Sequence, residues 1–459
     1  MAKWVGTDPT FYPSPKSAME APREKLAYVA LLQPDALGVI DLDPDSETYG
    51  QLINQLLLPG EEEDELHHFG WNACSSALCP TAFHPTLERR YLILPGIRSS
   101  RIYIVDTQPD PKSPRIVRTI EPEEIKERTG YSRLHTVHCG PDGIFISALG
   151  SGDGDGGPGG ILVLDHFNFN VLGAWEMDRG PQHFSYDFWW HIAHDVTVTS
   201  EWATPDLFEN GLNLDALLQR KYGHKMHFFD SRSRKHLTEI DFGDQHQMVL
   251  ELRPAHNPKK TYGFVSVVTD VTNLASSIWT WYQEDGKWDV KKIIEIPAQP
   301  ADPDQLPSAL KDVGAVPPLV TDIVLSLDDR YLYVPCWGTG ELRQYDVSDP
   351  LNAKLTGKVE IGGIVNQKAH PNGKKITGGP QMVELSRDGK RLYFSNSLYS
   401  SWDDQFYPEG IQGAVVKVDI LPEGGMEIDK DFLLQLEKGR AHQIRLDGGD
   451  CSTDTFCYP

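Results

Sequence analysis

The chain has 459 residues, of which 39% are hydrophobic and 24% charged, as in ordinary folded globular proteins. Its net charge of -23 at pH 7 makes nucleic acids and anionic membranes unsuitable partners, because the surface repels their phosphates. No run of about 18 apolar residues is present, so we expect no membrane-spanning segment. The first residues also lack the apolar core of a secretory signal, which predicts a cytoplasmic protein.

Short apolar runs separated by turn residues fill most of the chain, and this pattern predicts one short strand after another. The 40 glycines and 33 prolines fit a protein with many turns. Only two stretches favour helices, EPEEIKERTG at 121–130 and LNLDALLQRK at 212–221. The Gly-rich stretch at 150–161 predicts a loop that joins two strands of one unit, since no lysine or helix follows it to bind a phosphate.

A strand that ends at an aspartate, followed by a turn and another strand, recurs roughly every 60 residues. The aspartates that mark it are Asp43, Asp106, Asp165, Asp230, Asp285, Asp346 and Asp419. A hairpin with a tight turn precedes several of these segments, with turns at 142–143, 328–329 and 388–389. Each unit therefore contains two hairpins, or four strands.

Seven such units predict an all-β fold, a seven-bladed β-propeller with long loops and a few short helices. Closure into a ring also removes most exposed sheet edges. A β-sandwich is the alternative, but it does not explain the repeat. We expect one domain over residues 1–459, with residues 1 to about 25 packing on the propeller as an extension.

The six cysteines are Cys74, Cys79, Cys139, Cys336, Cys451 and Cys457. None stands in a CxxC pair, and six in so long a chain do not make a disulfide scaffold. We therefore expect reduced thiols. A thiolate at Cys74 beside imidazoles would be reactive and is a candidate catalytic group, although a free cysteine is as often an inert small hydrophobic residue.

Histidines recur close to the first strand of several units, far apart in the sequence. They are His67, His68, His135, His138, His194, His256 and His442. In a propeller the first strand of each blade lines the central channel, so these side chains are expected to gather around one axis. Imidazole-rich sites suit copper or zinc. The alternative is that each histidine only satisfies backbone groups in a polar channel.

Strand geometry limits how many ligands each pair can supply. Neighbours on a strand, and residues three apart, face opposite sides. His67 with His68, and His135 with His138, should therefore supply one ligand each unless the pair lies in a loop. Glu201 and Asp322 are candidates for holding the remaining imidazole nitrogens or for accepting a proton from a substrate.

Long motifs are similar to those of one known family. They include DELHHFGWNACSS, LHTVHC, YDFWWHIAHDVTVTSEWATP, RPAHNP and AHQIRLDGGDCSTD, within a similarity that runs from about residue 14 to 454. The chain resembles the selenium-binding protein family, whose members include methanethiol oxidases. The resemblance implies a seven-bladed propeller, copper held by the seven histidines, and conversion of methanethiol, dioxygen and water into formaldehyde, hydrogen sulfide and hydrogen peroxide.

Two departures from this family limit what the resemblance implies. Gly50 stands where many animal relatives carry a cysteine proposed to hold selenium, and CSSALC replaces their CSSC, which displaces Cys79. A non-enzymatic propeller that binds selenium, a metal or partner proteins remains the alternative function, because propellers host many functions. A calcium-dependent lactonase would need a channel of Asp, Glu and Asn side chains, and the many histidines argue against this function.

Overall fold

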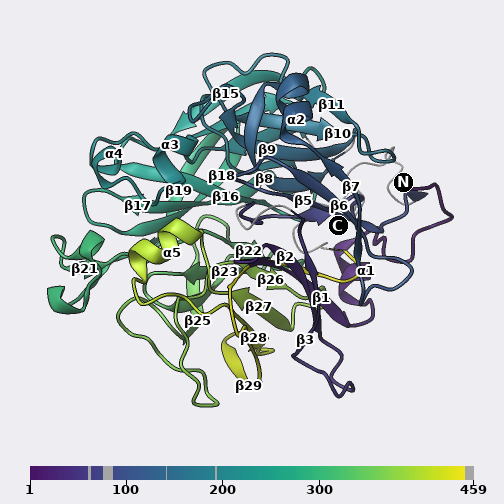
Figure 1. Cartoon of the computed structure of the whole chain (residues 1–459). Helices are drawn as coiled ribbons and strands as arrows, with labels where there is room; N and C mark the ends of the chain where they lie inside the picture. The colour runs from purple at the N-terminus through teal and green to yellow at the C-terminus, as the bar shows by residue number, and fades with distance from the viewer. Residues whose placement is uncertain (60–63, 76–85, 141, 192–193, 450–459) are drawn as a thin grey trace.

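Seven four-stranded antiparallel sheets form a β-propeller in the computed structural model (Figure 1). The structure describes residues 1–59, 64–75, 86–140, 142–191 and 194–449. The predicted all-β class and the number of blades are confirmed. In the part of the chain that is described, no helix has the length and apolar character needed to cross a membrane.

In each blade the innermost strand lines the channel, and three further strands follow it outward. Blade one contains β30 (Arg440–Leu446), β1 (Leu26–Leu32), β2 (Ala36–Asp41) and β3 (Leu52–Leu57). Blade two contains β4 (Gly70–Trp71), β5 (Tyr91–Pro95), β6 (Ile102–Asp106) and β7 (Arg115–Ile120). Blade three contains β8 (Tyr131–Cys139), β9 (Ile144–Ser151), β10 (Gly160–Leu164) and β11 (Val171–Ala174).

Blade four contains β12 (Phe188–His191), β13 (Val196–Ser200), β14 (Lys225–Asp230) and β15 (Lys235–Asp241). Blade five contains β16 (His246–Pro254), β17 (Tyr262–Asp270), β18 (Ser276–Glu284) and β19 (Lys287–Ile296). Blade six contains β22 (Val324–Leu325), β23 (Tyr331–Cys336), β24 (Glu341–Asp346) and β25 (Lys354–Glu360). Blade seven contains β26 (Val383–Leu385), β27 (Arg391–Ser395), β28 (Ala414–Ile420) and β29 (Met426–Gln435).

The short elements lie in the connections. They are α1 (Pro15–Met19), α2 (Pro122–Thr129), α3 (Pro205–Phe208), α4 (Leu214–Leu218), α5 (Ser400–Phe406), the 3-10 turns η3 (Pro303–Gln305) and η4 (Ser308–Leu310), and the strand pair β20 (Gln299–Pro300) and β21 (Ala315–Val316). Helices α2 and α4 occupy the two predicted helical stretches. Helix α2 ends at Gly130, whose φ of 74° is the left-handed conformation that glycine adopts readily at a helix C-terminus.

The ring closes because the last strand joins the first blade. Strand β30 pairs with β1 in an antiparallel register in which Ala27 lies opposite Leu446. Inner strands of neighbouring blades contact one another, as β4 with β8 and β12 with β16. The inner strand β16 is buried along its whole length, whereas the outer strand β25 is mostly exposed. Side chains on the inner strands therefore lie at the centre of the ring.

The cysteine prediction needs a correction. Cys74 and Cys139 form a disulfide although 65 residues separate them in the sequence, because β4 and β8 are neighbouring inner strands. Cys336 is free and buried, as expected. The other three cysteines lie outside the described residues. With its sulfur in a disulfide, Cys74 has no thiolate to offer a substrate, which removes the catalytic role predicted for it.

Candidate metal centre in the propeller channel

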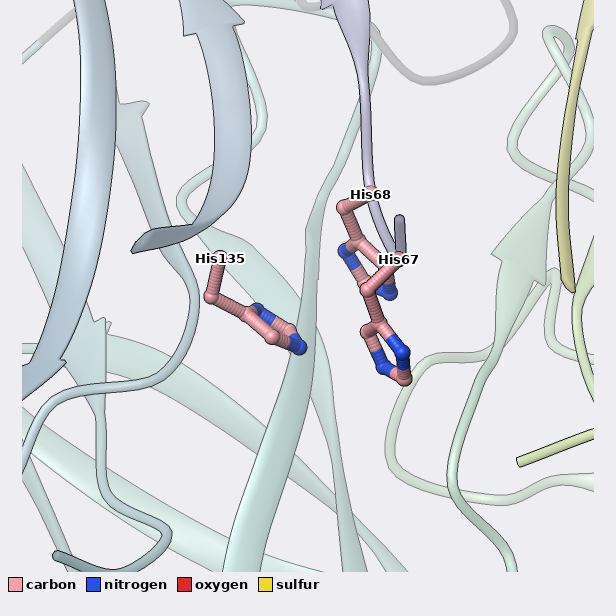
Figure 2. Close-up of side chains that lie close together, drawn as sticks. All are labelled: His67, His68 and His135. Atoms are coloured by element: carbon pink, nitrogen blue, oxygen red, sulfur yellow. The ribbon is translucent and has the colours of Figure 1, made fainter. Parts of the chain in front are cut away.

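Four histidines from three blades meet in the channel. His67 and His68 are separated from β4 by one residue, His135 lies in the middle of β8, and His442 lies on β30. The ring centroids of His67 and His442 are 3.6 Å apart, and those of His68 and His135 are 4.1 Å apart. None of the four is more than 2% exposed. Figure 2 shows the rings of His67, His68 and His135 converging, and their ligand nitrogens lie within 4.8 Å of one another.

Irregular pairing of the inner strands aims these side chains into the channel. On β8, Leu134 pairs with Ala148 and Val137 with Ile146, so the strand carries one extra residue at His135 and Thr136. On β30 the same irregularity falls beside His442. Such bulges rotate a side chain away from the regular alternation.

The bulge before β4 explains why two consecutive histidines face the same site. Leu66 pairs with Gly96, and Gly70 pairs with Ile93, which leaves one residue more on the histidine side. The backbone N–H of Phe69 donates to Oε1 of Gln443 at 2.6 Å, so this segment is held against β30. His67 and His68 thus behave as loop residues and both reach the cluster.

One nitrogen of each ring is buried without a hydrogen-bond partner. These atoms are Nδ1 of His67 and Nε2 of His68, His135 and His442. Buried polar atoms are nearly always hydrogen-bonded, so four exceptions in one place require an explanation. The ligand nitrogens of three of these residues, His67, His68 and His135, lie within 4.8 Å of one another, and this arrangement fits a metal ion that accepts imidazole ligands.

The opposite nitrogens of three of these rings, those of His68, His135 and His442, are held by neighbouring groups. Nδ1–H of His442 donates to the carbonyl oxygen of Ser397 at 2.7 Å. The hydroxyl oxygen of Thr136 lies 2.8 Å from Nδ1 of His135 and 3.4 Å from Nδ1 of His68. Such contacts fix the ring orientation and leave Nε2 available as a ligand.

The electrostatics of the cluster favour neutral imidazoles. Burial, followed by the neighbouring histidines, holds the pKa of His67, His68 and His135 well below the ordinary value of 6.5. Burial lowers the pKa of His442 to about 3. A metal can therefore bind at neutral pH without first displacing protons from these rings.

Aromatic side chains enclose the cluster. The ring centroid of His135 lies 4.5 Å from that of Tyr186 and 6.3 Å from that of Trp202. The ring centroid of His67 lies 5.9 Å from that of Tyr399. Trp202 and Tyr399 belong to a buried apolar core that includes residues of α3, α4 and α5. Nε of Arg98 donates to the hydroxyl of Tyr399 at 2.9 Å, and Arg98 lines a surface pocket of about 760 Å³. Tyr399 therefore lies between that pocket and the histidines.

A buried network of charged groups adjoins Tyr186. The Tyr186 hydroxyl donates to Glu251 at 3.2 Å, and Nη1 of Arg253 donates to Glu251 at 3.1 Å. Nη2 of Arg253 also donates to Asp322 at 3.2 Å, and Asp187 lies 3.5 Å from Arg253. Burial, followed by the charge of neighbouring carboxylates, raises the pKa of Glu251 and of Asp322 to about 8.

Three predicted metal ligands lie elsewhere. Nε2 of His138 lies 3.1 Å from Asp187, and its ring packs 3.9 Å from Trp189. His194 lies in the turn after β12, with its ring 4.8 Å from His191. His256 lies beyond the end of β16, and its Nε2 lies 3.1 Å from the carbonyl oxygen of Leu325. The last two positions follow the C-terminal ends of inner strands, away from the cluster.

The two predicted carboxylates also differ in their surroundings. Glu201 accepts a hydrogen bond from Nε2–H of His227 at 2.9 Å, so its carboxylate is engaged within blade four. Asp322 belongs to the Arg253 network. Sequence reasoning missed Tyr186, Glu251 and Arg253. They lie on or beside inner strands, which was the available signal, but no aspartate turn marks the β16–β17 hairpin that carries Glu251 and Arg253.

The buried carboxyl groups predict a pH dependence of stability. Glu251 and Asp322 have ordinary pKa values of 4.5 and 3.8, and both titrate near 8 in the folded protein. Between these values the folded state binds more protons than the unfolded state, so the free energy of unfolding should fall as pH rises and level off above about 8. Denaturant unfolding at several pH values in this range should show that the free energy of unfolding falls less steeply with pH in Glu251→Gln than in the wild type. The same pH dependence in the variant and the wild type would contradict the raised pKa assigned to Glu251.

The fold and the cluster together define a seven-bladed β-propeller with a buried imidazole site in its channel. The chain matches the family model of the 56 kDa selenium-binding protein over residues 5–457, and it belongs to this family. A methanethiol oxidase from Xenopus laevis is 40% identical over 97% of this chain and 98% of its own length. A human methanethiol oxidase is 38% identical over 99% of this chain and 100% of its own length.

Solved structures agree with this membership. The X-ray structure of a hypothetical selenium-binding protein from Sulfolobus tokodaii is 56% identical and matches with a TM-score of 0.95, covering 98% of this chain and 100% of that chain. A putative 6-phosphogluconolactonase from Bacteroides uniformis, 10% identical with a TM-score of 0.53, shares the fold alone. The predicted family resemblance is thus confirmed.

Proposed function

We propose that this protein is a copper-dependent methanethiol oxidase. It converts methanethiol, dioxygen and water into formaldehyde, hydrogen sulfide and hydrogen peroxide. The observation that carries the proposal is the cluster of buried imidazoles in the channel, each with one nitrogen that has no hydrogen-bond partner, and three of which bring ligand nitrogens within 4.8 Å of one another. The names of the relatives from Xenopus laevis and human support the substrate and the reaction.

His67, His68, His135 and His442 would hold the copper ion. Imidazole ligands suit both zinc and copper. Oxidation of a thiol by dioxygen requires a redox-active metal, and zinc has no redox chemistry, so we assign copper. When bound, copper supplies a soft site for a thiolate sulfur and a route for electrons to dioxygen.

The aromatic side chains around the cluster provide a small apolar site. Tyr186, Trp202 and Tyr399 exclude water from the histidines and offer contact area that suits a one-carbon substrate. The surface pocket beside Arg98 is the proposed route of entry, and Tyr399 must move for a substrate to pass.

The Tyr186–Glu251 pair is the proposed proton acceptor. Tyr186 lies against His135, and its hydroxyl donates to Glu251, so this carboxyl group is linked by a hydrogen bond to the wall of the site. A pKa near 8 allows Glu251 to accept and release a proton around neutral pH. This assignment replaces Glu201, whose carboxylate is bound to His227.

Replacing Tyr186 by phenylalanine is expected to lower kcat by about 10- to 100-fold, because the ring remains but the hydrogen bond to Glu251 is lost. Copper content should stay at the wild-type level. Steady-state kinetics with methanethiol and metal analysis of the same preparation measure both. A kcat equal to that of the wild type would exclude this role for Tyr186.

The proposal as a whole is tested by loading the purified protein with copper and supplying methanethiol in air. Hydrogen peroxide and hydrogen sulfide should form in equal amounts, and protein treated with a copper chelator should form neither. A non-enzymatic scaffold would form neither product in either preparation. The predicted cytoplasmic location and the docking of partner proteins stay predictions.

A further inference from the structure

A second group of ligand-type side chains lies on blade four, away from the channel strands. His227 lies on β14, and His236 and Glu239 lie on the outer strand β15. Nδ1 of His227 is 3.2 Å from Nε2 of His236 and 3.8 Å from Oε2 of Glu239. One ligand atom from each residue lies within 4.8 Å of the others.

A bulge in the strand pair places the three side chains on one face. His227 lies opposite Glu239, and Phe229 lies opposite His236, with one extra residue on β15 between these pairs. Without the bulge, His236 and Glu239 would face opposite sides, since they are three residues apart on a strand. The backbone N–H of His236 donates to the carbonyl oxygen of Asp178 at 2.9 Å, which fixes this part of the strand.

The hydrogen bonds leave unshared electron pairs directed at one point. Nε2–H of His227 donates to Oε1 of Glu201 at 2.9 Å, so the lone pair of His227 is on Nδ1. Oε2 of Glu201 accepts from the backbone N–H groups of His224 and Lys225 at 3.3 and 3.2 Å, which keeps that carboxylate an acceptor.

Glu239 supplies the third ligand atom. Its Oε1 accepts from Lys225 at 2.7 Å, but its Oε2 is buried without a hydrogen-bond partner. A hydrogen bond from His236 to His227 alone would leave that oxygen unsatisfied. A bound cation satisfies His227, His236 and Glu239 together.

We propose that His227, His236 and Glu239 bind a zinc ion, with Glu201 as a positioning residue that orients His227. Two imidazoles and one carboxylate are an established zinc donor set, and zinc–nitrogen bonds of about 2.0–2.1 Å place two tetrahedral ligand nitrogens about 3.3 Å apart. The observed separation of 3.2 Å matches that geometry. His227 is fully buried, whereas His236 and Glu239 are partly exposed, so the ion can enter from solvent and keep a water as fourth ligand.

The site is tested by counting metal ions on the full-length protein. Apoprotein is titrated with Zn²⁺ in the presence of a chromophoric chelator, and the wild type is compared with His236→Gln, Glu239→Gln and His224→Gln. The wild type and His224→Gln, which lies on the same blade but contacts Asp241, should bind one equivalent more than His236→Gln. Glu239→Gln should bind that equivalent at least about 10-fold more weakly.

Titration with Co²⁺ gives an independent measurement, because tetrahedral Co²⁺ absorbs visible light. The absorption difference between wild type and His236→Gln should show one tetrahedral site. Circular dichroism verifies that the variants are folded, and Glu239, which is partly exposed, provides a variant with little risk to the fold. Equal metal stoichiometry and affinity in the wild type, His236→Gln and Glu239→Gln would overturn the proposal.

Discussion

Replacing His135 by alanine is expected to abolish copper binding and to lower methanethiol oxidase activity by more than about 100-fold. Loss of a residue that only orients a metal ligand typically costs about 10- to 100-fold, so loss of a ligand should cost more. His135 is fully buried, and its Nε2 points into the cluster without another partner. Copper per chain and the rate of peroxide release should fall together.

The matched control is His183→Ala, because His183 is an exposed histidine outside the channel cluster. This variant should keep the copper content and the activity of the wild type. Circular dichroism must show that His135→Ala retains its strands. His135 lies at the bulge between Leu134 and Val137, the β8 residues that pair with β9 on either side of it. A folded His135→Ala protein with full copper and full activity would rule out His135 as a ligand.

Replacing Arg253 by methionine is expected to lower the free energy of unfolding by about 3–5 kcal/mol, the usual cost of removing one partner of a buried ion pair. Arg253 contacts Glu251, Asp187 and Asp322, and all four side chains are buried. Without the guanidinium, the pKa of each carboxyl group must rise further. The deficit should therefore be larger at pH 8 than at about pH 5, where protonation relieves the repulsion.

Denaturant unfolding at the two pH values measures this deficit, and Arg232→Met is the control. Arg232 pairs with Asp195 at 2.8 Å, but both side chains are largely exposed. Exposed pairs of this kind contribute only about 0–1 kcal/mol. Equal losses in the two variants, or a deficit at Arg253 that does not change with pH, would contradict the role assigned to the buried network.

The fold was predictable because its signals are short-range. The marker aspartates Asp106, Asp230 and Asp346 end β6, β14 and β24, which are the third strands of their blades. The predicted hairpin turns at 142–143, 328–329 and 388–389 join the first and second strands of blades three, six and seven. Turn residues and apolar alternation act locally, so they can be read without knowing which blades are neighbours.

The site was predictable only in part, because the sequence places a histidine near a blade but not at a height along the channel. His135 lies in the middle of β8, whereas His256 lies two residues beyond the end of β16. The two side chains are therefore at different heights along the channel. The bulges were also invisible in the sequence. They bring both His67 and His68 into the cluster, against the alternation rule, while His138 obeys that rule and faces Asp187.

Residues that act through distant partners were missed for the same reason. Glu251 lies at a bulge of β16, between Val249 and Leu252, and no tight aspartate turn marks that hairpin. The disulfide of Cys74 and Cys139 requires knowing that β4 and β8 are adjacent. Side-chain contacts between blades depend on closure of the ring, which no single stretch of sequence reveals.

The central claim is that imidazoles from three blades bind one copper ion at the centre of the ring. X-ray absorption at the copper edge of the loaded protein tests it most directly, because imidazole rings produce a recognisable scattering pattern beyond the first shell of nitrogen ligands. We predict one copper per chain at this site, with three or four imidazole ligands, and fewer imidazoles or no copper in His68→Ala. Copper coordinated mainly by oxygen or sulfur, or an imidazole count unchanged in His68→Ala, would contradict the claim.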